Sequence, residues 1–228
     1  KTLSEAGFGT REREVLGDFG HAYFSGQYVR HTNHFASHLL RLVENEEAGS
    51  KAELVRDGGA ILLGIAAHDF RGLAACIAGA LYHHRVAVSQ AHLFSAAKHG
   101  LALDFFHLAT GQALPRDLTA AVQDALQRKL YIAESDAASL PPLSGSFQLD
   151  GTERGGYCLR HETVSEISGL LYALTYKVFH HLSGSIHGLS AYTSRGSTYV
   201  TVHLTLPSNR SLAEAQQIVE REFRSDDA

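Results

Sequence analysis

Hydrophobic positions in the first part of the chain recur at helical spacing. Within residues 28–47, Phe35, Leu39 and Leu42 fall on one side of a helix. Several aromatic residues of the same part indicate a surface that packs against another element. We therefore predict that residues 1–59 form a helical N-terminal arm.

From residue 60 the pattern changes to short strands and helices in a repeated order. A buried strand is followed by a helix, a hairpin and a second helix, and the same order then begins again. The first round comprises strand 60–67, helix 71–84, strands 85–94 and 101–109, and helix 118–131; the second comprises strand 155–164, helix 169–182, strands 185–193 and 197–206, and helix 211–223. Residues 144–150 add one more predicted strand between the rounds.

The two rounds look like an internal duplication. The segments "RGLAACIAGALYHH" and "SGLLYALTYKVFHH" match at a Gly-Leu start and at a closing His-His pair, and Gly72 and Gly169 lie 97 residues apart. With residues 144–150 as its last strand, the first round has the order βαββαβ, which is that of a ferredoxin-like fold.

The predicted fold class is therefore α+β, with two ferredoxin-like repeats after the arm. We expect the first repeat to cover residues 60–150 and the second residues 151–228. Because each repeat would leave an open sheet edge, we expect the two to pair side by side as adjoining antiparallel sheets.

Composition narrows the classes of partner. The 228 residues carry a formal net charge of -4, so no basic excess points to nucleic acid. The sequence shows neither a long apolar run nor a signal-peptide pattern, and we expect a cytoplasmic protein with no membrane partner. Cys76 and Cys158 lie in apolar runs and are interpreted as buried thiols. Methionine is absent, position 1 included, which favours a trimmed chain or a fragment.

Three histidines within "HTNHFASH" raise the question of a metal site. On one continuous helix His31, His34 and His38 would share a side, and His34 and His38 could together bind zinc. Such a site needs a third protein ligand, and flanking arginines would oppose a cation. We predict no metal site here and interpret the histidines as a solvated helix edge.

Other candidate chemistry is weaker. His68-Asp69 resembles the dipeptide of metal-dependent phosphohydrolases, but it ends a predicted strand and lacks the further ligands on helices that such sites need. The pairs His83-His84 and His180-His181 end equivalent helices, where a cationic side chain is favourable. Phosphate-binding loops, dinucleotide fingerprints and nucleophile motifs are absent from the sequence. We predict no cofactor and find no catalytic centre.

The segment "AAHDFRGLAACIAGAL" resembles the opening of an ACT regulatory domain, whose loop between first strand and first helix usually reads Asp-Arg-Pro-Gly-Leu. Together with "GLALDFFHL", "ISGLLYALTYKVF" and the arm segment "AYFSGQYVRHTNHFASHLLRL", it is most similar to the C-terminal tandem-ACT region of bifunctional protein-PII uridylyltransferase/uridylyl-removing enzymes. The resemblance implies a regulatory module of nitrogen metabolism that binds an amino acid such as glutamine. It also implies allosteric control of a catalytic domain or partner, a homodimer, and a possible PII-type signal protein as partner.

The resemblance places effector-binding positions in two loops and at two strand starts. These positions are His68, Asp69, Phe70, Arg71, Gly72 and Leu73 in the first loop (residues 68–73), Glu166, Ile167, Ser168, Gly169 and Leu170 in the second loop (residues 165–170), and Ala87 and Ser185 at the strand starts. The sequence departs from the family at several of them: the second loop retains only the glycine, and the family's asparagine is absent at both strand starts.

Physically, a glycine that opens a helix suits a ligand carboxylate, because it allows close approach to free N–H groups at the positive end of the helix dipole. Asp69 or Glu166 could then hold an ammonium group. Three interpretations stay open: an effector-binding module, a dimerisation scaffold whose glycines only make tight turns, and a C-terminal fragment of a uridylyltransferase whose chemistry lies elsewhere.

Overall fold

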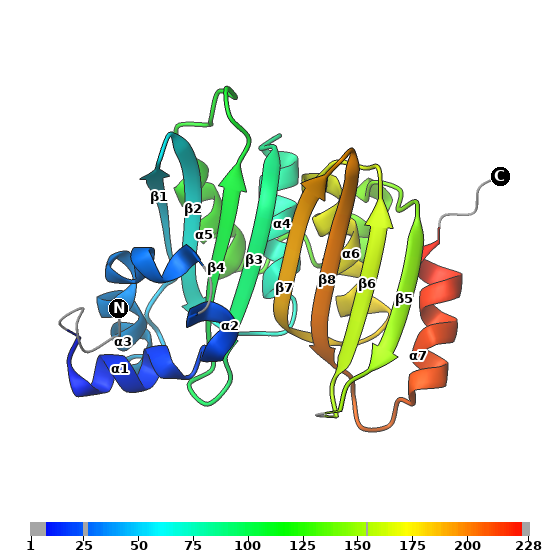
Figure 1. The fold of residues 1–228 in the computed structure, drawn as a ribbon, viewed down its shortest axis with the longest axis horizontal. Helices are drawn as coiled ribbons and strands as arrows, with labels where there is room; N and C mark the ends of the chain where they lie inside the picture. Colours follow the sequence, from blue (N-terminus) through cyan, green and yellow to red (C-terminus); the bar gives the residue numbers. More distant parts are fainter. Residues whose placement is uncertain (1–7, 25–26, 154, 225–228) are drawn as a thin grey trace.

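The computed structural model describes residues 8–24, 27–153 and 155–224 and has one eight-stranded antiparallel sheet with helices on both faces (Figure 1). The strand order is β1-β2-β4-β3-β7-β8-β6-β5. The strands are β1 (Lys51–Asp57), β2 (Ala60–His68), β3 (Val88–Ala96), β4 (Leu101–Leu108), β5 (Ser146–Gly151), β6 (Tyr157–Thr163), β7 (Ser185–Ser194) and β8 (Ser197–Thr205). The chain thus combines helices with a single sheet.

The sheet has two halves with mirrored strand order. The first half is β1-β2-β4-β3 and the second is β7-β8-β6-β5, and each is built as a hairpin, a helix, a hairpin and a helix. The helices on the shared face are α4 (Leu73–His83), α5 (Leu118–Arg128), α6 (Ile167–His180) and α7 (Leu212–Ile218), the last continued by the π-turn η3 (Val219–Phe223); a 3-10 turn, η2 (Glu134–Ser139), lies in the connection between the halves. In Figure 1, α4, α5 and α6 lie behind the sheet.

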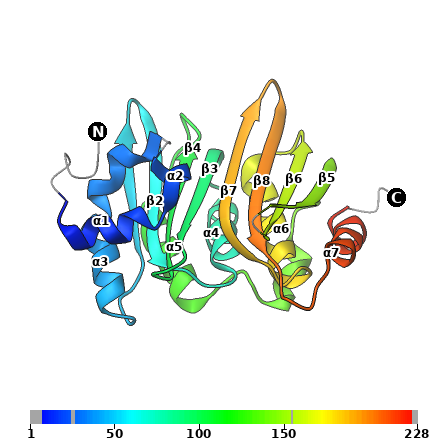
Figure 2. The ribbon, with the colours of Figure 1, turned by 60° about the horizontal axis from the view of Figure 1, so that its bottom comes forward.

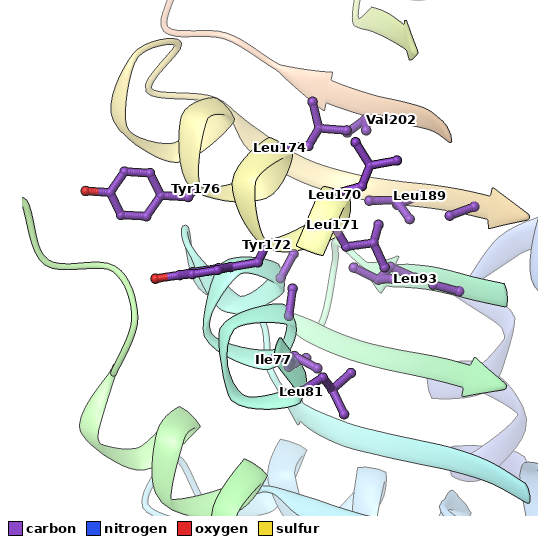
Figure 3. Packing of buried hydrophobic residues seen from close by; sticks show 14 of the residues in the cluster. Ile77, Leu81, Leu93, Leu170, Leu171, Tyr172, Leu174, Tyr176, Leu189 and Val202 are labelled. Carbon is purple, nitrogen blue, oxygen red and sulfur yellow. The ribbon is translucent and has the colours of Figure 1, made fainter. Parts of the chain in front are cut away.

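The halves join where β3 pairs with β7. Antiparallel pairing runs from Gln90 opposite Tyr192 to Phe94 opposite Gly188, and α4 packs beside α6 behind this junction. Figure 3 shows Leu93 and Leu189, one from each inner strand, pointing toward these helices. The expected sheet continuity across both halves is confirmed.

Helix α4 carries apolar or small residues around its whole circumference, which matches its position between other elements on every side. All its residues from Leu73 to Leu81 are buried, between the sheet, α5 and α6. An amphipathic surface helix would keep a polar face, so the composition of this segment already reflects its central place.

The N-terminal arm covers the other face of the first half only (Figures 1 and 2). It consists of α1 (Thr10–Gly17), α2 (Gly20–Phe24), the 3-10 helix η1 (Gln27–His34) and α3 (Ala36–Glu44). Its aromatic side chains form a second core with the sheet, in which Tyr28 stacks on Phe105 with ring centres 4.6 Å apart. The prediction that the arm packs on another element is confirmed.

Two strand assignments made from the sequence are wrong. Residues 51–57, assigned to the arm, form β1, and residues 144–150 do not complete the first half, because β5 pairs with β6. The outer position of the first half is already occupied by β1, which is joined to β2 through Gly58 and Gly59, both at positive φ. Such a two-residue turn fits the strand twist, and short loops cost little entropy to close, so each local hairpin forms in preference to a distant pairing.

The helix expected over residues 28–47 is also interrupted. The 3-10 helix ends at His34 and α3 begins at Ala36, because the Phe35 ring inserts against Gly64 of β2. The three histidines therefore do not share one helix side, and His31 is buried rather than solvated.

Gly64 is a testable determinant of arm docking. A Cβ built at Gly64 would lie 2.3 Å from Cζ of Phe35, whose side chain is fully buried. We expect Gly64→Ala to lower the free energy of unfolding by about 1–3 kcal/mol, the usual cost of overpacking, and to expose the arm to limited proteolysis.

Gly49→Ala is the matched control, because no atom lies within 4 Å of the added Cβ. Equal unfolding free energies for the two variants in chemical denaturation would contradict this account of how the arm is held.

Candidate functional site

Each glycine loop meets an aromatic side chain of the opposite half. Gly72, at φ 104°, caps α4, and its Cβ position lies 3.3 Å from the ring of Phe179 on α6. A Cβ built at Gly169 would correspondingly lie 3.4 Å from the ring of Tyr82 on α4. The two predicted loops therefore face each other's half across the β3–β7 junction.

A small cavity lies beneath the first loop; we name it the interface cavity. Its volume is about 20 Å³, enough for a single water. The lining combines both halves: Asp69, Phe70, Gly72, Leu73, Ala74, Ala75, Leu93, Ser95, Ala102 and Asp104 from the first, and Thr175, Phe179, Gly184 and Ile186 from the second. Predicted loop residues and one unforeseen carboxylate thus share one space.

That carboxylate belongs to Asp104 on β4, which is 1% exposed. The Phe94 backbone N–H donates to its Oδ1 over 3.2 Å, while Oδ2 has no hydrogen-bond partner among the described residues. Burial, with the nearby Asp69 as a second cause, raises the pKa of Asp104 well above its ordinary value. Burial also raises the pKa of Asp69, opposed by a hydrogen bond with the Ser95 side chain.

The fold itself does not require a carboxylate at this position. In the first half Asp104 pairs with Leu93, and at the matching place in the second half Val202 pairs with Leu189. Val202 is completely buried beneath α6 (Figure 3). An apolar residue therefore serves the same structural position, and Asp104 carries a desolvation cost that Val202 does not.

The second loop lacks this arrangement. There, the Val88 N–H donates to Oγ of Ser168 over 3.0 Å, and the Ser168 hydroxyl donates to the Val86 carbonyl over 2.9 Å. Glu166, at the N-cap of α6, is exposed. The two loops are alike in position but not in chemistry.

The predicted positions at the strand starts also differ. The backbone N–H and carbonyl of Ala87 both bond to the amide side chain of Gln112, at 2.9 and 2.7 Å. Ser185 is exposed at the start of β7, between the cavity-lining residues Gly184 and Ile186. The first loop and the start of the opposite strand β7 therefore line one cavity together.

The remaining candidates are structural. His34 contacts Glu53 at 2.9 Å and His38 contacts the Gly49 carbonyl at 2.9 Å, so the two rings have separate partners. No group of three metal-ligating side chains occurs within residues 8–24, 27–153 and 155–224. Cys76 and Cys158 are both buried, and burial raises the pKa of the Cys76 thiol to about 12.

A larger groove of about 1100 Å³ lies on the arm side, between Tyr28 and the second half of the sheet. His92, His187 and His203 are among its lining residues, and burial lowers the pKa of His92 to about 4. None of the described lining residues of the groove is a buried Asp, Glu, Lys or Arg, whereas the smaller interface cavity is lined by the two carboxylates of Asp69 and Asp104. We therefore take the interface cavity as the candidate site, because titratable groups with shifted pKa values mark functional sites better than volume does.

Comparison with known proteins does not assign a family to this chain. No protein-family model matches the chain, and no curated protein matches it. One solved structure, described as a crystal structure of a hypothetical protein, is similar over 79% of this chain and 96% of its own, with 10% identity and a TM-score of 0.23. Within the described residues, every helix is too short or too polar to cross a membrane.

Asp104 was missed in the sequence because it lies inside a strand. The signal was present in "LALDFFHL", where one charged residue interrupts an otherwise apolar run. Alternation along β4 places Asp104 on the same face as Ala102 and Phe106, which contact the core below the helices. A charge on the buried face of a strand could have been identified as a candidate.

The raised pKa of Asp104 predicts a pH-dependent stability. The folded protein holds this proton more tightly than the unfolded chain, so stability falls as pH rises from about 4, the unfolded value, through the folded pKa. As pH rises from 5 to 8, we expect the free energy of unfolding of Asp104→Asn to increase by about 1–3 kcal/mol relative to that of the native protein. Denaturant unfolding at both pH values measures this.

Asp124→Asn, at an exposed helix position of α5, is the control and should show little change with pH. A difference between Asp104→Asn and the native protein that stays constant across this range would show that Asp104 does not hold its proton as argued.

Proposed function

We propose that this protein is a tandem ACT-like regulatory module that binds a free amino acid at the first loop. The observation that supports this most directly is the interface cavity, which is lined by the glycine loop of one half and the helix end and strand start of the other. A ligand held there contacts both halves at once. Its binding energy then depends on how the halves are arranged.

The arrangement of strands supports an ACT-like interpretation with one difference. In each half a helix connects two parallel strands across an antiparallel third, as in a ferredoxin-like unit. The outer strand comes before this unit, as β1 or β5, instead of after it. The relation is thus one of spatial layout with a rearranged chain order.

Regulation would follow from differential binding. An effector can shift an equilibrium only if it binds one arrangement better than another. The first loop contacts Phe179 of α6, so a ligand that enters between them changes the packing of α6 on α4. The arm is carried on the first half, and a catalytic domain or partner attached through it would sense that change.

Because the two loops differ in their hydrogen bonds, we expect only one of them to bind a ligand. Ser168 already satisfies the Val86 carbonyl and the Val88 N–H with its own hydroxyl, so a ligand at the second loop would have to replace two hydrogen bonds. Beside the first loop, by contrast, Oδ2 of Asp104 on β4 has no hydrogen-bond partner among the described residues. One amino acid per chain is expected.

Calorimetric titration with L-glutamine, followed by the other common amino acids, tests the proposal. We expect saturable heat with one ligand per chain, lost in Asp69→Ala by at least about tenfold in affinity because a hydrogen-bonded charge at the site is removed. Glu166→Ala is the matched control in the second loop and should bind as the native protein does.

A flat trace with every amino acid, from a folded protein, would reject the sensor and leave the scaffold interpretation, which the occupied second loop favours. Equal losses in Asp69→Ala and Glu166→Ala would place the binding site elsewhere.

A further inference from the structure

Opposite walls of the interface cavity carry opposite electrostatic character. One wall contains the carboxylates of Asp69 and Asp104, and these are the only titratable side chains among the lining residues. Another wall is the first turn of α4, at Leu73, Ala74 and Ala75. The eleven-residue helix has no side-chain cap at Gly72, so its N-terminal amides and dipole present positive character there.

In the described part of the chain, the polar atom of this cavity without a hydrogen-bond partner is Oδ2 of Asp104. Asp104 is completely buried, its Oδ1 accepts from Phe94, and only Oδ2 is left without a partner among the described residues. A buried carboxylate oxygen without a donor is costly, and a second carboxylate nearby increases the cost. A cationic group that donates hydrogen bonds to both carboxylates would remove both penalties.

We propose that Asp104, together with Asp69, forms the ammonium subsite of the effector site, and that the carboxylate of the same ligand lies at the N-terminus of α4. This inference rests on the proposed function and specifies it: the effector is a zwitterion with a free α-ammonium group. The cavity volume of about 20 Å³ suits a group the size of ammonium or water.

A zwitterion fits this cavity better than a bare metal cation does. The Thr175 hydroxyl donates to the Leu171 carbonyl over 2.6 Å. It is therefore not directed at a metal ion held by the two carboxylates. The positive end of α4 opposes a lone cation but attracts a carboxylate. An α-amino acid satisfies both walls with one molecule.

The rest of the ligand needs space that Phe179 now occupies. Its ring lies against Gly72, and the Arg71 guanidinium lies 5.0 Å from the ring centre. Entry of an amino acid therefore displaces this ring from Gly72. Phe179→Ala removes that requirement and is expected to strengthen binding.

Ammonium binding has a consequence for protons. Burial and the nearby Asp69 raise the pKa of Asp104, whereas a bound ammonium group would lower it again. Any proton that Asp104 holds in the empty cavity is then released to solvent on binding, while the ligand keeps all three ammonium protons. Binding is therefore expected to be accompanied by proton release.

Two matched ligand pairs test the subsite. L-Glutamine is compared with glutaramate, and L-alanine with propionate, since each pair differs only in the α-ammonium group. Titration calorimetry is run in phosphate and in Tris at pH 7, because the difference in buffer ionisation enthalpy reports proton release. We expect at least one of the two amino acids to bind, its deaminated counterpart to bind at least roughly tenfold more weakly, and proton release to accompany the amino acid alone.

Asp104→Val and Asp104→Asn are the variants. The valine variant reproduces the side chain of Val202 at the matching position and is expected to fold, which circular dichroism and thermal unfolding verify. Both variants should lose at least roughly tenfold in affinity and should release no proton on binding. Asp124→Asn should behave as the native protein in both respects.

The possible failures are distinct. If the native protein binds an amino acid but Asp104→Val binds it equally, or if the deaminated analogue binds as tightly, the subsite is rejected while the proposed function stands. If neither amino acid binds the native protein but another member of the panel does, the same comparison is made with that amino acid and its deaminated analogue. If no amino acid binds, the proposed function and the subsite are both rejected.

Discussion

The pairing of β3 with β7 is the contact on which the rest of the molecule depends. Each half of the sheet has an inner edge strand, β3 or β7, that pairs on only one side within its own half, and an exposed edge leaves backbone groups without partners. The β3–β7 ladder consists of five residue pairs, from Gln90 opposite Tyr192 to Phe94 opposite Gly188. This short ladder places α4 against α6 and brings each glycine loop beside the helix of the opposite half. The interface cavity exists because of that juxtaposition.

The two halves solve the same packing problem with different chemistry. Beneath the second half, Val202 fills the core and Ser168 closes the junction with its own hydrogen bonds. Beneath the first half, Asp104 stands at the matching position, and its Oδ2 has no hydrogen-bond partner in the described part of the chain. A duplicated fold can carry this inequality because one half suffices to keep the apolar packing intact. Of these two matched positions, only Asp104 carries the energetic cost of a buried charge, and such local costs are typical of functional sites.

Local sequence signals and long-range geometry contributed differently to what could be foreseen. Helices α4 and α6 and the inner hairpins follow from periodicity, since these segments keep the same hydrophobic pattern in any context that buries them. The sequence assigned β1 to the arm and β5 to the first repeat because a short strand is defined by its partner, and the partner of β1 is set by the Gly58-Gly59 turn. The break at Phe35 depends on Gly64, a contact 29 residues away along the chain that no local pattern contains.

By itself, the sequence determined the class of fold, the internal duplication, the two glycine loops and the candidate acidic residue Asp69. These features are encoded in short-range periodicity and in residues whose backbone requirements are local. The tertiary structure alone decided that the first loop lines a cavity while Ser168 of the second loop bonds to Val86, and that Asp104 and Asp69 share that cavity. The physical reason is that burial and charge proximity are properties of space. Residues 69 and 104 become neighbours only after β4 has paired between β2 and β3 and both halves have closed over them.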